Sequence, residues 1–161
     1  MTRSPATPPP RRTIDFERGV PFLVAALGNR LSAIASARLR RELGIGLMEW
    51  RILALLAVEA EATPARIGQV AGVDKSVVSR AAGSLEKRGL IAVGAEAAAG
   101  RQTRVAMTAE GLRMHERGIH IAYDSNDALL EGFTDADRAQ LSDLLRRLVA
   151  NLPKLEAKPG R

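Results

Sequence analysis

The spacing of apolar residues along the chain predicts a mainly helical protein. Apolar residues recur every three or four positions in residues 22–43, which predicts an amphipathic helix. Residues 47–61 are apolar on most sides, as in a helix buried within a domain. Two longer amphipathic helices are predicted at 109–133 and 134–152, and we expect Pro153 to end the second.

The centre of the chain predicts two short helices joined by a tight turn. The first covers residues 63–71, where Thr63 is suited to cap the helix, and Gly72-Val73 forms the turn. The second covers residues 75–88 and follows Asp74, which we expect to cap it. Its apolar stripe has the i, i+3, i+4, i+7 spacing that predicts a buried face. The stripe consists of Val78, Ala81, Ala82 and Leu85.

The opposite face of this second helix carries small polar and basic residues. They are Lys75, Ser76, Val77, Ser79, Arg80 and Gly83. Two helices of this kind form a helix-turn-helix, whose second helix can enter the major groove of DNA. Arg80 is suited to guanine, or to a salt bridge within the lobe, and Val77 to a thymine methyl group. Lys75 is expected to contact phosphate.

A β-hairpin is predicted after the helix-turn-helix. Residues 90–93 and 101–107 have strand patterns and are joined by a loop of small residues. Such a hairpin is a wing, on which Arg101 is suited to the minor groove. For Arg104, a phosphate contact and a solvent-exposed position are both open.

Composition excludes several classes of protein. The 161 residues suffice for one domain, or for one domain with an appended oligomerisation part, and the absence of cysteine excludes disulfides and thiolate metal sites. The two histidines lie in no nucleophile motif or metal cluster, so we expect no catalytic residue, metal or cofactor. No run approaches the eighteen apolar residues of a membrane span, and no signal peptide is visible, so we expect a cytoplasmic protein without a membrane partner.

Charge favours a polyanionic partner. The net charge is +6, and residues 64–105 hold seven basic and three acidic side chains. Residues 109–152 hold five basic and eight acidic side chains. The positive charge therefore collects on the helix-turn-helix and the wing.

The terminal helices have more apolar surface than this segment can cover, which predicts a homodimer. A two-fold dimer would bind an inverted repeat in double-stranded DNA, with half-sites about 34 Å apart.

Four segments together resemble the MarR family of bacterial regulators, over most of residues 22–152. They are Glu49-Trp50-Arg51-Ile52-Leu53, Asp74-Lys75-Ser76-Val77-Val78-Ser79-Arg80, Leu85-Glu86-Lys87-Arg88-Gly89-Leu90-Ile91, and Arg101 with Met107-Thr108-Ala109-Glu110-Gly111. The resemblance implies a mainly α fold with a small β-hairpin wing, and an obligate dimer. It also implies repression of neighbouring genes and release by a small aromatic or phenolic ligand. The alternative is an architectural DNA-binding or protein-interaction dimer without an effector.

The resemblance divides the chain into a domain and two tails. A disordered tail rich in proline and arginine covers 1–19, the MarR-like domain 20–152, and a C-terminal tail 153–161. Within the domain, 20–43 and 109–152 would be dimerisation helices and 47–108 the winged helix-turn-helix.

The ligand site and the wing leave alternatives open. Trp50, Arg51 and His115 are candidates to line a ligand pocket, although Trp50 and His115 also suit core packing. The family usually has an aspartate two residues before the wing arginine, where this chain has Ala99. Its absence predicts a looser wing and weaker DNA binding.

Overall fold

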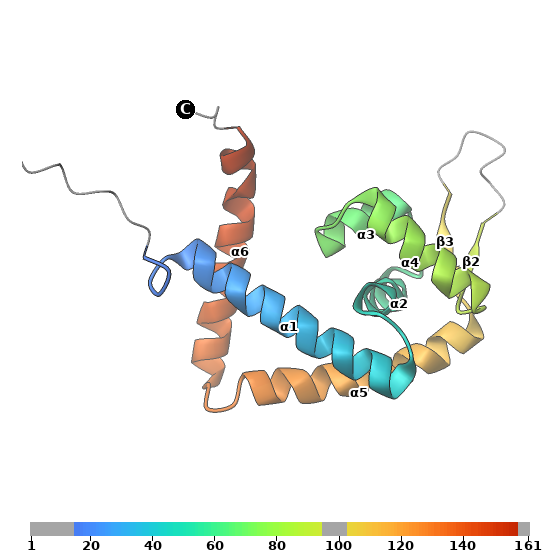
Figure 1. Cartoon of the computed structure of the whole chain (residues 1–161), viewed down its shortest axis with the longest axis horizontal. Helices are drawn as coiled ribbons and strands as arrows, with labels where there is room; N and C mark the ends of the chain where they lie inside the picture. The colour runs from blue at the N-terminus through green and yellow to red at the C-terminus, as the bar shows by residue number, and fades with distance from the viewer. Residues whose placement is uncertain (1–14, 95–102, 158–161) are drawn as a thin grey trace, which may run out of the picture. The chain divides into compact units, whose positions relative to one another are not determined.

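The protein is mainly helical with one small sheet, as its sequence pattern predicts. The computed structural model describes residues 15–94 and 103–157, whose helices and strands are shown in Figure 1. The helices are α1 (Val20–Leu43), α2 (Leu47–Glu59), α3 (Pro64–Ala71), α4 (Lys75–Lys87), α5 (Ala109–Leu129) and α6 (Asp135–Glu156). The strands are β1 (Glu61–Ala62), β2 (Ile91–Val93) and β3 (Val105–Met107). The chain divides after His115 into a winged unit and a C-terminal unit, so α5 contributes to both.

The sheet of the winged unit has three antiparallel strands in the order β1-β3-β2. Ala106 of β3 is paired with Glu61 on one side and with Ala92 on the other. The predicted hairpin of β2 and β3 is therefore present, but the sequence pattern does not predict β1, the third strand of the sheet. We expected the helix of residues 47–61 to continue through Glu61, whereas α2 ends at Glu59 and the next residues pair with the wing.

The core of the winged unit is built around α2, as predicted. Each of its main side chains is at most 2 % exposed. They are Leu39, Ile45, Ile52, Leu53, Leu56, Ile67, Val78, Leu85, Leu90, Ile91 and Val105. Because these residues come from four helices, from the α1–α2 turn, from the bend before β2 and from two strands, the core fixes α4 and the base of the wing to one scaffold.

Hydrogen bonds at the helix starts confirm the cap predicted at Thr63 and show that threonine side chains also cap the last two helices. Thr63 Oγ1 accepts from the Arg66 amide at 3.2 Å, and Thr134 and Asp137 form a reciprocal capping box. Thr108 Oγ1 accepts from the amide of Gly111 at 3.1 Å and donates to the carbonyl of Gly89 at 2.7 Å. Asp74 occupies the N-cap position of α4, as predicted, but its side chain makes no capping hydrogen bond.

Two predicted boundaries also require correction. Pro153 lies inside α6, which continues to Glu156, because only the bond from its missing amide is lost near the end of the helix. Residues 15–19, assigned to the disordered tail, form a turn in which Asp15 accepts from the amides of Glu17 and Arg18 at 2.9 Å. Residues 1–14 and 158–161 of the predicted tails lie outside the described residues.

Helix α1 is more apolar than the sequence analysis expected. It is long and apolar enough to cross a membrane by length and composition, with a mean hydropathy of 1.4 over 18 residues. Helices of soluble proteins also reach such values.

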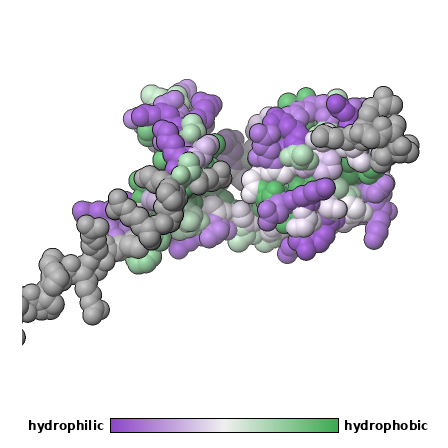
Figure 2. Space-filling view, turned by 90° about the horizontal axis from the view of Figure 1, so that it is seen from above, coloured by the Kyte–Doolittle hydropathy of each residue, from purple (hydrophilic) through white to green (hydrophobic). Residues whose placement is uncertain are grey.

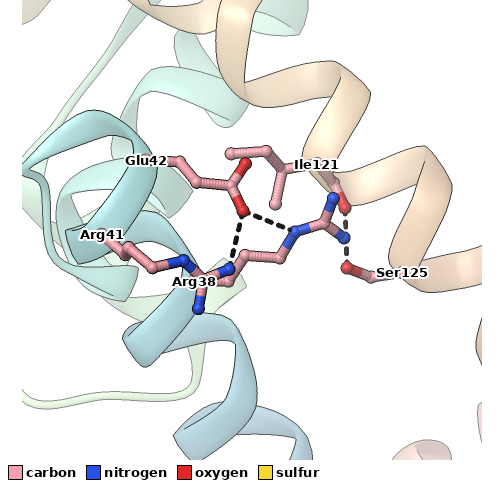
Figure 3. Close-up of polar contacts among 5 residues, drawn as sticks. All are labelled: Arg38, Arg41, Glu42, Ile121 and Ser125. Carbon is pink, nitrogen blue, oxygen red and sulfur yellow. Dashed lines mark hydrogen bonds and ion pairs between the residues drawn. The ribbon is translucent and has the colours of Figure 1, made fainter.

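The last turns of α1 are charged, since Arg38 and Arg41 both donate hydrogen bonds to Glu42, at 3.0 and 2.9 Å (Figure 3). These bonds lower the pKa of the Glu42 carboxyl group, the bond from Arg38 most strongly.

The C-terminal unit exposes an apolar stripe. In α5, Ser125 Oγ donates to the carbonyl oxygen of Ile121 at 2.7 Å, a bond within one turn that Figure 3 includes. In α6 the apolar side chains are between 37 % and 66 % exposed. They are Leu141, Leu144, Leu145, Leu148, Val149, Leu152 and Leu155. This unit therefore buries little of its own apolar surface.

Candidate nucleic-acid interface

The exposed side of α4 carries the residues that the sequence selects for the major groove. Val78 and Leu85 are fully buried, and Ala81 is 9 % exposed, so one face of α4 is fixed against the core. Its other face presents the candidate side chains. Lys75, Ser76, Ser79 and Arg80 are exposed, and Val77 is half-buried. The structure thus brings these five candidate DNA contacts onto one face of one helix, while the other two candidates, Arg101 and Arg104, belong to the wing segment.

A close approach between α3 and the turn sets the position of α4. Gly72 ends α3 with a left-handed backbone, φ 65°, which glycine adopts without strain. A side-chain Cβ at Gly68 would lie 3.0 Å from the carbonyl oxygen of Val73, so that position also favours glycine. The turn therefore holds the first turn of α4 close to α3, as a helix-turn-helix requires.

Several hollows lie beside α4, and two of them lie at the turn before it and along its C-terminal half. One, of about 550 Å³, runs over the turn from Gly68 to Val77. The other, of about 610 Å³, has three cationic side chains and no acidic side chain in its lining. It is lined by Ser79, Arg80, Gly83, Ser84, Lys87 and Arg88. Lys87 and Arg88 are not among the contacts predicted from the sequence, although their i+7 and i+8 spacing from Arg80 places them on the same side of a helix. Such a basic surface can bind phosphate groups.

The base of the wing carries an ion pair that the sequence did not indicate. Arg104 Nη1 lies 3.6 Å from Glu61 Oε2, and both side chains are more than half exposed. This pair links β1 to the residue before β3. Arg101 and Ala99, on which the minor-groove contact and the predicted loosening of the wing depend, lie outside the described residues. Figure 2 shows hydrophilic and hydrophobic side chains together on one face of the winged unit.

The three candidate ligand residues are only partly brought together. The rings of Trp50 and His115 stack, with centroids 5.3 Å apart and planes at 8°. Trp50 is 9 % exposed, in agreement with the core-packing alternative. Arg51 is exposed to solvent on the same helix as Trp50.

An ion pair fixes the start of α3 to the end of α2. Arg66 donates from Nε and Nη2 to the carboxylate of Glu59, with the shortest N–O distance 2.6 Å. These bonds hold the pKa of the Glu59 carboxyl group below its usual value. Because α3 packs against α4, the pair supports the first half of the helix-turn-helix.

We expect this ion pair to make the winged unit less stable in acid. Glu59 has a lower pKa in the folded state than its ordinary value of 4.5, so the pair stabilises above about pH 4.5, and this stabilisation is lost as the pH falls through the folded-state pKa. Glu59→Gln and Arg66→Gln should each flatten the fall of the unfolding free energy in this range. Urea titrations between pH 3 and 7 measure it. A slope equal to that of the wild type in both variants would contradict the assignment.

The winged segment matches a known family, and the whole fold matches known structures. Residues 43–102 match a family model described as "MarR family". The chain is similar to a MarR/EmrR family transcriptional regulator from an Acinetobacter species, with 28% identity, a TM-score of 0.81, and coverage of 88% of this chain and 99% of that one. No curated protein matches the chain by sequence.

Two more distant structures share the fold and contain a bound molecule. One is a MepR-DNA complex from S. aureus, with 17% identity, a TM-score of 0.72, and coverage of 84% of this chain and 98% of that one. The other is the PcaV regulator from Streptomyces coelicolor in complex with its natural ligand, with 23% identity, a TM-score of 0.71, and coverage of 87% and 98%.

Proposed function

Because this chain is a winged helix-turn-helix protein of the MarR family, we propose that it is a dimeric, sequence-specific DNA-binding repressor of neighbouring genes. The observation that carries the proposal is the exposed basic face of α4. That face is presented by a helix whose opposite side is locked into the core. The fold that MepR uses in its complex with DNA supports the same role for this chain.

The DNA contacts divide by the information that they carry. Arg80 can form two hydrogen bonds with guanine O6 and N7, and Val77 can contact a thymine methyl group, so these residues would read sequence. Lys75, like Lys87 in the lining of the larger hollow, would bind phosphate and supply affinity. Ser76 and Ser79 are short hydroxyl side chains that suit either contact. Arg101 and Arg104 would act from the wing, and Arg104 would have to leave Glu61 to reach phosphate.

A homodimer is supported by apolar side chains that neither unit covers. On α1, five of them are between 44 % and 63 % exposed: Val20, Leu23, Val24, Leu27 and Ile34. The stripe of α6 is exposed to a similar degree. A second copy of the chain would remove both surfaces from water, which favours association. Two copies would present two recognition helices, our name for α4 in this role, to half-sites about 34 Å apart.

Release by a small aromatic or phenolic ligand is the second part of the proposal. The PcaV structure with its natural ligand supports ligand control within this fold. In this chain Trp50 and His115 supply an aromatic pair next to the winged core, and Arg51 supplies an exposed cation. An anionic ring compound would suit this set, because the cation can bind its charge and the rings its face.

Selection from a random duplex pool at two salt concentrations tests the DNA-binding part. We expect enrichment of an inverted repeat with half-sites about one turn apart. Binding that is tight at low salt and unenriched would favour the architectural alternative, because phosphate contacts alone carry no sequence information. No binding at either salt concentration would show that the proposed function is wrong.

The selected duplex then tests ligand control. We expect simple hydroxybenzoates, tested as a panel by fluorescence anisotropy of the labelled duplex, to lower the affinity of the wild type. Trp50→Leu should weaken this response and leave the affinity without ligand close to that of the wild type. Failure of every member of the panel would contradict control by phenolic acids and favour the alternative without an effector.

A further inference from the structure

The α1–α2 turn and the first turn of α2 each hold the recognition helix by one hydrogen bond, and the two donors, Ser84 and Arg88, lie about one helical turn apart. Arg88 Nη1 donates to the carbonyl oxygen of Gly44 at 3.0 Å. Ser84 Oγ donates to Glu49 Oε1 at 2.6 Å. The turn residue between the two glycines, Ile45, is fully buried. The C-terminal half of α4 is thus tied to the place where α1 ends and α2 begins.

Glu49 joins the two helices through a single carboxylate. Its Oε2 accepts from the amide of Gly46, which satisfies a free N–H group at the start of α2, while Oε1 accepts from Ser84. Both bonds are partly buried, so solvent competes with them less than with a bond on the open surface. Any change in the start of α2 therefore reaches α4 directly.

The bonds of Ser84 and Arg88 affect the position of Arg80, because all three residues lie on the same side of α4. Arg80, Ser84 and Arg88 follow one another at i, i+4 and i+8, and line the same hollow of about 610 Å³. A tilt of α4 about its buried contacts would move all three of these side chains together. Release of the Ser84 bond would therefore shift Arg80 relative to the groove, although Ser84 itself need not touch DNA.

We propose that Glu49, Ser84 and Arg88 are positioning residues for DNA binding, which fix the orientation of the recognition helix relative to the α1–α2 turn. This inference rests on the proposed function. It also gives a route of regulation, because α1 ends at Leu43, immediately before Gly44, and carries part of the apolar surface assigned to the dimer. A displacement of α1 would reach the recognition helix through the carbonyl oxygen of Gly44 and the carboxylate of Glu49.

Ser84→Ala tests the proposal, because it removes the bond without changing charge and alanine favours helix. We expect the affinity for the selected duplex to fall about tenfold, which corresponds to about 1.4 kcal/mol. The affinity for an unrelated duplex and the salt slope should stay as in the wild type, because no phosphate contact is lost. Ser84→Thr keeps a hydroxyl group and should restore the affinity.

Hydrogen exchange in the absence of DNA gives a second, independent measurement. The amides of Arg88 and Leu90 donate to carbonyl oxygens within α4 and report on its last turn. We expect them to exchange faster in Ser84→Ala and at the wild-type rate in Ser84→Thr.

The outcomes separate this proposal from the proposed function. Unchanged exchange in Ser84→Ala would overturn the positioning role, even if the wild type selected no sequence and the proposed function had failed. Equal weakening on all duplexes, with a lower melting temperature, would also overturn it, since that result marks a structural role alone.

Discussion

Gly111→Ala is expected to destabilise the winged unit by about 3 kcal/mol, because the first turn of α5 is packed against the chain before β2. A Cβ at position 111 would overlap the carbonyl oxygen of Leu90 and lie 2.7 Å from Met107 Cγ. The Met107 side chain can move. The Leu90 carbonyl cannot, because it accepts a hydrogen bond from the Thr108 amide at 3.1 Å. Denaturant unfolding at a fixed protein concentration measures the change.

Gly83→Ala is the matched control for this substitution. Gly83 lies in the interior of α4, and a Cβ there would meet no atom within 4 Å. Alanine at this position should stabilise by about 0.5–1 kcal/mol, since it reduces the freedom of the unfolded chain and favours helix. If both variants unfolded like the wild type, the packing of α5 on Leu90 described above would be incorrect.

Arg80→Ala and Lys75→Ala are expected to weaken DNA binding in different ways. Loss of Arg80 should cost about 1–3 kcal/mol on the selected duplex, and relax the preference at one position of each half-site. Loss of Lys75 should weaken selected and unrelated duplexes alike, and lower the salt slope by about one per protomer. Titrations of both duplexes at several salt concentrations measure both effects.

Arg147→Ala provides the control for loss of charge. Arg147 lies on α6 in the C-terminal unit, 3.9 Å from Asp143, outside the helix-turn-helix. Its removal changes the net charge by the same amount as each variant of α4. If Arg80→Ala bound both duplexes as well as this control did, Arg80 would not read sequence.

The elements with a periodic apolar pattern could be predicted from the sequence, whereas the shortest strand, β1, could not. The stripe of α4 was assigned correctly because its apolar spacing matches one helical face, with Val78 and Leu85 fully buried. Strand β1 has only two residues, too few to show alternation. Strand β1 forms because its residues pair with the edge of β3. This pairing joins positions far apart in the chain, such as Glu61 and Ala106. The helix end predicted at Pro153 was wrong, because the effect of a proline on a helix depends on how many helical residues follow it.

The candidate interface shows the same division. Lys75 to Arg80 could be selected from local spacing, because all of them lie within two turns of one helix. Whether their roles are as assigned remains a prediction. The bond between Ser84 and Glu49 spans 35 residues, and no local pattern indicates it. The stacking of Trp50 on His115 likewise depends on the packing of α2 against the start of α5.

The stacked pair at Trp50 has a practical consequence for spectroscopy. Trp50 is the only tryptophan of the chain and is nearly buried in the winged unit, whereas the only tyrosine, Tyr123, lies in the C-terminal unit. Tryptophan emission therefore reports on one unit, while far-ultraviolet circular dichroism sums the helices of both. Coincident melting curves from the two signals would mean that the units unfold as one cooperative body. Separate curves would give each unit its own stability, without any label or added chromophore.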